Sequence, residues 1–88
     1  MVSRQITIVN RDGFHMRAAG DFAKAMAAFQ SEVTVSSANK SVNGKSMMHL
    51  IASGFQKGTE LTVQCEGPDE AAQLDKACAM IASGFGEA

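Results

Sequence analysis

The period of the apolar residues changes once near the start of the chain, and this change constrains the fold more than any other feature. Ile6 and Ile8 alternate with polar residues, which is the period of a strand. From Met16 onward, apolar residues recur at steps of three and four, which is the period of a helix. The Asp12-Gly13 pair supplies a turn between the two. The sequence therefore predicts a strand, a tight turn and a helix, with His15 at or just before the first helical turn.

The predicted position of His15 has a chemical consequence. The first turn of a helix leaves backbone N–H groups unpaired and carries the positive end of the helix dipole, so it binds anions and phosphate above all. Arg17 adds a cation whose donor fork suits phosphate oxygens. Histidine is among the side chains that form covalent intermediates. The residues point to a phosphohistidine at His15 assisted by Arg17; the alternatives are a histidine that only caps the helix and a solvated surface arginine.

The same patterns predict the remaining elements. In order, we expect a strand over residues 3–9, a helix over 16–29, strands over 31–37 and 41–43, a short helix with Ser46 at its N-cap and Gly54 just past its end, a strand over 59–66, and a helix that opens at 67–70 and ends at Gly84. The expected core positions are Ile6, Ile8, Ala19, Phe22, Ala23, Met26, Phe29, Val33, Val35, Leu61, Val63, Cys65, Ala71, Leu74, Cys78 and Ile81.

This element order predicts the fold class. Short connections favour antiparallel pairing of the strands, and each helix carries one apolar stripe. The chain is therefore expected to form an α+β two-layer open-faced sandwich, with a four-stranded antiparallel sheet, three helices on one face and the order β-α-β-β-α-β-α. Its 88 residues fit one domain, residues 1–88.

Composition excludes several classes of function. A net charge of −1 and the absence of Tyr and Trp argue against a nucleic-acid-binding domain. No segment approaches the ~20 apolar residues that span a bilayer, and the first residues lack the apolar run of a signal peptide. We therefore expect a cytoplasmic protein without membrane insertion.

The two cysteines show no metal-ligand spacing. Cys65 falls in a predicted strand and Cys78 in a predicted helix, with no C-x-x-C motif. We expect two reduced core thiols, with a disulfide or a redox role as the alternative. No metal and no cofactor are expected.

Two segments carry a resemblance to a known family. Residues 13–17 read Gly-Phe-His-Met-Arg and residues 43–48 read Asn-Gly-Lys-Ser-Met-Met. They resemble the Gly-Leu/Ile-His-x-Arg-Pro motif and the Lys-Ser-Ile/Leu-Met segment of the HPr family, the histidine-containing phosphocarrier proteins of the bacterial sugar phosphotransferase system. The resemblance covers the whole chain. Two residues depart from the family pattern. Ala18 replaces the family proline, which loosens the start of the helix. His49 stands where relatives often have Gly or Lys, and it either alters the choice of partner or is merely solvated.

The resemblance implies a function and its partners. His15 would accept a phosphoryl group on Nδ1 from phosphoenolpyruvate by way of Enzyme I, and would pass it to the IIA domain of a sugar permease, with Arg17 stabilising it. Ser46 matches the serine that a dedicated kinase phosphorylates in many Gram-positive relatives, where the modified protein also binds a transcriptional regulator; a plain N-cap is the alternative. The chain would then be a monomeric carrier whose partners complete the site, and not a self-sufficient enzyme.

The segment after Ser46 is too apolar for a helix with a wholly solvated outer face. Flexible methionines suit a surface that binds several partners. We predict a docking patch beside His15 that is made of Phe14, Met47, Met48, Ile51 and Phe55. The alternative is that all of these side chains are buried.

The rival function is a regulatory or specialised phosphorelay module of the HPr type that acts mainly through protein binding. The presence of His15 argues against binding alone, whereas Ala18 and His49 leave a specialised relay open.

Overall fold

Four strands and three α-helices follow one another in the predicted order in the computed structural model, which describes residues 1–86. The domain expected over 1–88 therefore ends in two residues that lie outside the described residues. The elements are β1 (Val2–Thr7), α1 (Met16–Ala27), β2 (Glu32–Ser36), β3 (Ser41–Asn43), α2 (Met47–Ser53), β4 (Glu60–Glu66), α3 (Glu70–Ala82) and the short 3₁₀ helix η1 (Gly84–Gly86).

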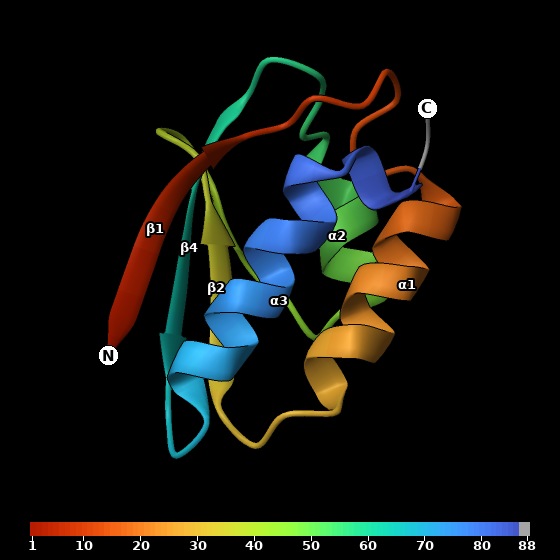
Figure 1. The fold of residues 1–88 in the computed structure, drawn as a ribbon. Coiled ribbons are helices and arrows are strands. Elements are labelled where there is room, and N and C mark those ends of the chain that lie inside the picture. The colour runs from red at the N-terminus through yellow and green to blue at the C-terminus, as the bar shows by residue number, and fades with distance from the viewer. Residues whose placement is uncertain (87–88) are drawn as a thin grey trace.

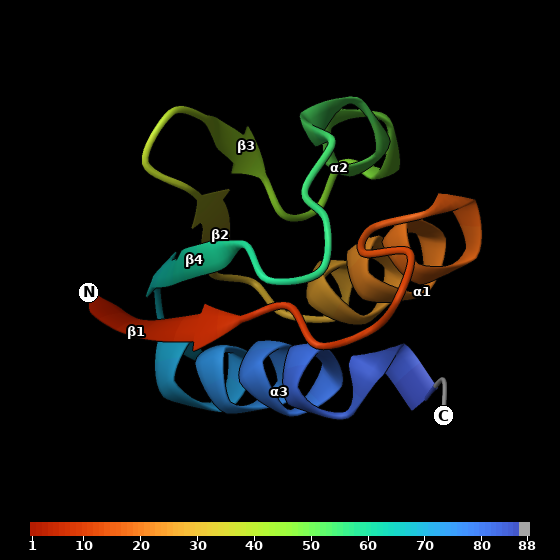
Figure 2. The same ribbon diagram turned by 90° about the horizontal axis from the view of Figure 1, so that it is seen from above.

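The strands form one antiparallel sheet in the spatial order β1-β4-β2-β3. β4 is a central strand, since its Val63 lies opposite Arg4 of β1 and Val35 of β2. All three α-helices lie on one face of this sheet (Figure 1). Seen from above, α3 runs alongside β1 while α2 lies near β3 (Figure 2). The predicted α+β open-faced sandwich is confirmed.

The core lies between the sheet and the helices. A fully buried Val, Leu, Ile or Phe side chain contributes about 1.5–3 kcal/mol of transfer free energy, so this layer supplies most of the stabilisation. Its largest buried side chains include Phe22 and Met26 of α1, Val35 of β2, Leu50 of α2, Leu61 and Val63 of β4, and Ile81 of α3.

The ends of the first strand and first helix differ from the predicted ones. β1 ends at Thr7, so Ile8 is buried although it lies in the segment after the strand. Ile6, inside the strand, is only partly buried. α1 ends at Ala27, and Phe29 packs against the core from the loop that follows. In both cases an apolar residue that continues the pattern is buried without belonging to the element, because burial of a side chain does not require regular backbone.

The buried face of α3 differs from its predicted apolar stripe. Ala71, expected in the core, is exposed, whereas Gln73 is fully buried. The Gln73 amide Nε2 donates to the backbone carbonyls of Met26 (3.3 Å) and Ser31 (2.9 Å). These two bonds tie α3 to the last turns of α1 and to the loop between α1 and β2, whereas the Gln73 Oε1 atom is buried without a hydrogen-bond partner among the described residues.

Candidate functional site

His15 occupies the N-cap position of α1. Its backbone is extended, with φ −75° and ψ 177°, and the first helical hydrogen bond runs from the Ala19 amide to the His15 carbonyl at 2.8 Å. The amides of Met16, Arg17 and Ala18 precede that bond and so have no carbonyl partner within the helix. The His15 side chain is partly exposed. The predicted position of the histidine, immediately before the first helical turn, is confirmed.

The turn before His15 is fixed by its neighbours. Gly13 has a φ of +59°, and the Phe14 amide donates to the carbonyl of Phe55 at 3.2 Å. The side chain of Asn10, which is buried, donates through Nδ2 to the Gly13 carbonyl at 2.8 Å. This role of Asn10 was not predicted from the sequence. Its only sequence signal is an asparagine three residues before a glycine, a spacing that is common in turns.

A small hollow of about 70 Å³ lies beside His15. It brings the two predicted reactive residues together, because both line its wall. The lining residues are His15, Arg17, Ala18 and Asp21 of α1 and Phe85 and Gly86 of η1. Arg17 is exposed, so its guanidinium is available to an anion at the imidazole. The hollow therefore combines an imidazole, a guanidinium and the start of a helix, which suits a phosphoryl group.

The C-terminal turn forms one wall of this hollow. α3 runs to Ala82 with Ser83 as its C-cap, and Gly84, which was predicted to end this helix, follows with φ +66° and begins a further turn. Phe85 adopts φ +58° in that turn, and its ring centroid lies 4.9 Å from that of Phe14 and 6.3 Å from that of Phe22. The Gly-Phe-Gly sequence of the turn was the available signal, since glycines flank a residue in a left-handed conformation.

The predicted docking patch is partly wrong. Phe14 and Phe55 are both only 5% exposed, because the Phe14 ring packs in the core against Phe22, Phe55 and Phe85. The apolar residue immediately before His15 therefore faces inward. Ile51 is partly buried against the core.

Three exposed methionines lie in the first turns of α1 and α2. Met47 and Met48 are 38% and 72% exposed, as predicted. Met16, which was not predicted to belong to the docking patch, is 70% exposed. Met47 lies against α1, with its sulfur 3.5 Å from the position that a Cβ on Gly20 would occupy. We call Met16, Met47 and Met48 the methionine surface.

Ser46 is the N-cap of α2, as predicted. Its hydroxyl oxygen accepts a hydrogen bond from the His49 amide at 3.2 Å. Gly54 ends the same helix with a φ of +70°. The Ser46 side chain is partly exposed and is the residue immediately before Met47, so it lies at the border of the methionine surface.

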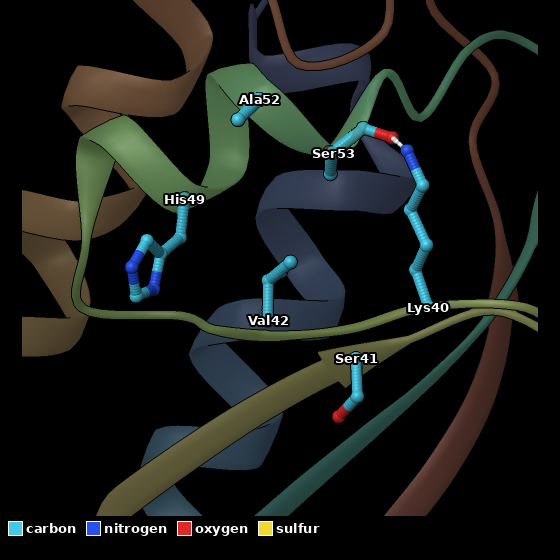
Figure 3. Close-up of a pocket in the computed structure, with 6 residues that line it drawn as sticks. All are labelled: Lys40, Ser41, Val42, His49, Ala52 and Ser53. Atoms are coloured by element: carbon cyan, nitrogen blue, oxygen red, sulfur yellow. Dashed lines mark hydrogen bonds between the residues drawn. The ribbon is translucent and has the colours of Figure 1, made fainter.

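His49 lines a different pocket. It is exposed, and together with Lys40 and Val42 it borders a hollow of about 430 Å³ between β3 and α2 (Figure 3). Lys40 Nζ donates to the Ser53 carbonyl at 2.9 Å at the other end of that pocket. His49 is not among the residues that line the hollow beside His15.

The cysteines are free and buried, as expected. Burial raises the pKa of the Cys65 thiol to about 11. No cluster of three or more potential ligands for a metal ion occurs among residues 1–86. Within that same range, every helix is too short or too polar to cross a bilayer.

Comparison with known proteins decides the family. A family model described as "PTS HPr component phosphorylation site" matches residues 2–83. The chain belongs to this family. The phosphocarrier protein HPr of Haemophilus influenzae is 37% identical over 81 residues, which are 92% of this chain and 95% of that protein. The phosphocarrier protein HPr of Neisseria meningitidis serogroup B is 37% identical over 87 residues, which are 99% and 98%.

Solved structures of the family share the fold. HPr-C-His from Thermoanaerobacter tengcongensis superposes with a TM-score of 0.94 at 34% identity, covering 100% of this chain and 99% of that one. An HPr dimer from the same organism gives a TM-score of 0.77 at 34% identity, covering 99% and 100%. The predicted resemblance to the HPr phosphocarriers of the phosphotransferase system is confirmed.

Proposed function

We propose that His15 carries the phosphoryl group of this phosphocarrier, that Enzyme I loads it from phosphoenolpyruvate, and that a IIA domain of a sugar permease receives it. The observation that supports this most is the placement of a partly exposed imidazole at the N-cap of α1. There the ring adjoins the first turn of α1, whose amides favour anions, and Arg17 lines the same hollow.

Transfer on His15 requires alignment and charge stabilisation more than further catalytic groups. On loading, a ring nitrogen, Nδ1 in the family, bonds to phosphorus as the donor's bond to phosphorus breaks. On unloading, the same nitrogen is the leaving group. Arg17 and the helix amides balance the charge on the three phosphoryl oxygens. We therefore regard the chain as a cofactor-free carrier whose partners complete the site, and not as an enzyme by itself.

Ser46 is the proposed site of regulation by a kinase. Its hydroxyl lies at the start of α2, beside exposed Met47 and Met48. A phosphate there adds negative charge next to an apolar docking surface, which weakens the contact with Enzyme I and offers a new feature to a transcriptional regulator. We assign the exposed docking role to the methionine surface, with partly buried Ile51 at its edge. We further propose that residues 1–88 act as one monomeric domain in the cytoplasm.

The test of the carrier function is labelling of His15. Wild-type protein incubated with Enzyme I and labelled phosphoenolpyruvate should gain an acid-labile label. The His15→Ala variant should stay folded and gain none, whereas His49→Ala, which changes the other histidine, should be labelled like the wild type. Label that persists on His15→Ala would refute the proposal. A wild-type protein that binds Enzyme I without gaining label would favour the rival, a module that acts by binding alone.

A further inference from the structure

Asp21 carries the negative charge among the described residues that line the hollow beside His15. It follows Arg17 by four residues and Ala18 by three, so all three lie on one face of α1. Side chains on a helix lean toward its N-terminus. The Asp21 carboxylate therefore leans toward the first turn of α1, where the phosphoryl group is proposed to sit.

Asp21 does not neutralise Arg17 in this structure. The ion pairs found within residues 1–86 join the Met1 amino group to Glu70 and Arg4 to Asp75, so Arg17 and Asp21 share the hollow without forming one. The hollow is small, with a volume of about 70 Å³. A phosphoryl group on His15 would therefore share this hollow with the exposed residues Arg17 and Asp21.

We propose that Asp21 raises the phosphoryl-transfer potential of this carrier. Its charge repels the phosphoryl oxygens and competes with them for the Arg17 guanidinium, so the phosphorylated form is less stable than it would be with a neutral residue at position 21. This inference rests on the proposed phosphorylation of His15. It adds a positioning residue that lies outside both segments on which the family resemblance was based.

An equilibrium measurement isolates this effect. In the reaction that Enzyme I catalyses, the P–O bond of phosphoenolpyruvate breaks, a P–N bond forms on His15, and the enolate of pyruvate takes up the proton that the imidazole gives up. The fraction of phosphorylated chain at a fixed ratio of pyruvate to phosphoenolpyruvate depends on the stability of the phosphorylated form. It does not depend on how tightly Enzyme I docks, because a catalyst leaves the equilibrium unchanged.

The experiment titrates the phosphorylated fraction against the pyruvate:phosphoenolpyruvate ratio with catalytic Enzyme I. For Asp21→Asn, half-phosphorylation should need a ratio about two- to fivefold higher than for the wild type, the range expected for one exposed charge pair. Asp21→Glu keeps the charge and should restore the wild-type ratio. The difference in this ratio between Asp21→Asn and the wild type should shrink at about 1 M salt, where the Debye length is about 3 Å.

A matched control changes an equal charge far from the site. Glu66 is exposed and ends β4 where the chain enters the α3 turn, at the opposite end of the fold from the start of α1 (Figure 1). Glu66→Gln should leave the ratio unchanged. Three outcomes would overturn this inference while leaving the proposed function intact. They are equal ratios for the wild type and Asp21→Asn, equal ratios for Asp21→Glu and Asp21→Asn, and an effect of Asp21→Asn that does not change with salt. A wild-type chain that is never phosphorylated would overturn the proposed function and this inference with it.

Discussion

The ring of Phe85 packs against the ring of Phe14 with centroids 4.9 Å apart, so the C-terminal turn supports the residue that immediately precedes His15. The contact has a conformational cost, because Phe85 has φ +58° and ψ 31°, and a left-handed conformation costs a residue with a Cβ about 1–2 kcal/mol. Packing of the ring must exceed that cost. The turn after α3 is therefore part of the site and not an appendage of the last helix.

Substitution of Phe85 should separate packing from strain. Phe85→Ala should lower the free energy of unfolding by about 2 kcal/mol, below the range for a fully buried Phe because this ring is only partly buried. Phe85→Gly removes the same ring but tolerates the positive φ, so it should be about 1 kcal/mol more stable than the Ala variant. Urea unfolding measures both values. A Gly variant less stable than the Ala variant would show that strain at this position is negligible.

The change of period near residue 10 predicted the most about this fold. It placed a strand, a turn and a helix correctly, and it put His15 at the N-cap because Gly13 and the first apolar helical residues leave little freedom in between. Ser46 and Gly54 were predicted as the two ends of α2 for a similar reason: capping residues act locally. The spatial strand order β1-β4-β2-β3 depends on contacts between distant residues, and the local pattern did not specify it.

The parts of the site that the sequence did not predict depend on the direction of side chains. Phe14 adjoins His15 in the chain but points into the core. Asp21 reaches the hollow from a later turn of α1, and Phe85 reaches it from the C-terminal end of the sequence. Gln73 is buried with its Nε2 group bonded to two carbonyls, which no pattern of apolar residues reveals.

Substitution of Ser46 should separate helix capping from regulation. Ser46→Ala removes the acceptor of the His49 amide and should lower the free energy of unfolding by about 1 kcal/mol. Ser46→Asp keeps an acceptor and adds negative charge at a helix start, so its stability should match or exceed that of the wild type. Urea unfolding tests both.

Loading by Enzyme I tests the regulatory role of Ser46 independently of stability. The Asp variant should be loaded more slowly than the wild type, because its charge borders the methionine surface, while the Ala variant should be loaded at the wild-type rate. Equal loading rates for Ser46→Asp and the wild type would contradict the regulatory proposal.

The Asp69 carboxylate should make stability depend on pH. It accepts hydrogen bonds from the Ser31 hydroxyl and from the amides of Gln30 and Ser31, which hold the pKa of Asp69 below its usual range. A lowered pKa means that the stabilisation is complete above the unfolded value of about 4 and is lost as the pH falls through the lower, folded value. Asp69→Asn should therefore have a lower urea midpoint than the wild type at pH 7, and the difference should shrink toward pH 2.

Ser31→Ala tests the cause of that pH dependence. It keeps the carboxylate but removes the hydroxyl, which contributes most to the lowered pKa of Asp69. The stability of this variant should fall less steeply than that of the wild type as the pH drops from 5 to about 2. If the stability of Ser31→Ala fell with pH as steeply as that of the wild type, the lowered pKa of Asp69 would be due to the backbone amides instead.

Gly13→Ala should disrupt the turn that presents His15. Gly13 has φ +59°, and a Cβ there would clash with the carbonyl oxygen of Phe55, so the alanine is both strained and blocked by backbone. Gly54→Ala is the matched control, since Gly54 has φ +70° with nothing within 4 Å of the added carbon. Gly54→Ala should lower the free energy of unfolding by about 1 kcal/mol from strain alone, whereas Gly13→Ala should lower it by at least about 2 kcal/mol more. Gly13→Ala should also slow phosphorylation of His15, because relief of the clash moves the N-cap. Equal losses of stability in the two variants would mean that the segment before α1 yields easily, and the helix start would then not be held in place by the Phe55 backbone.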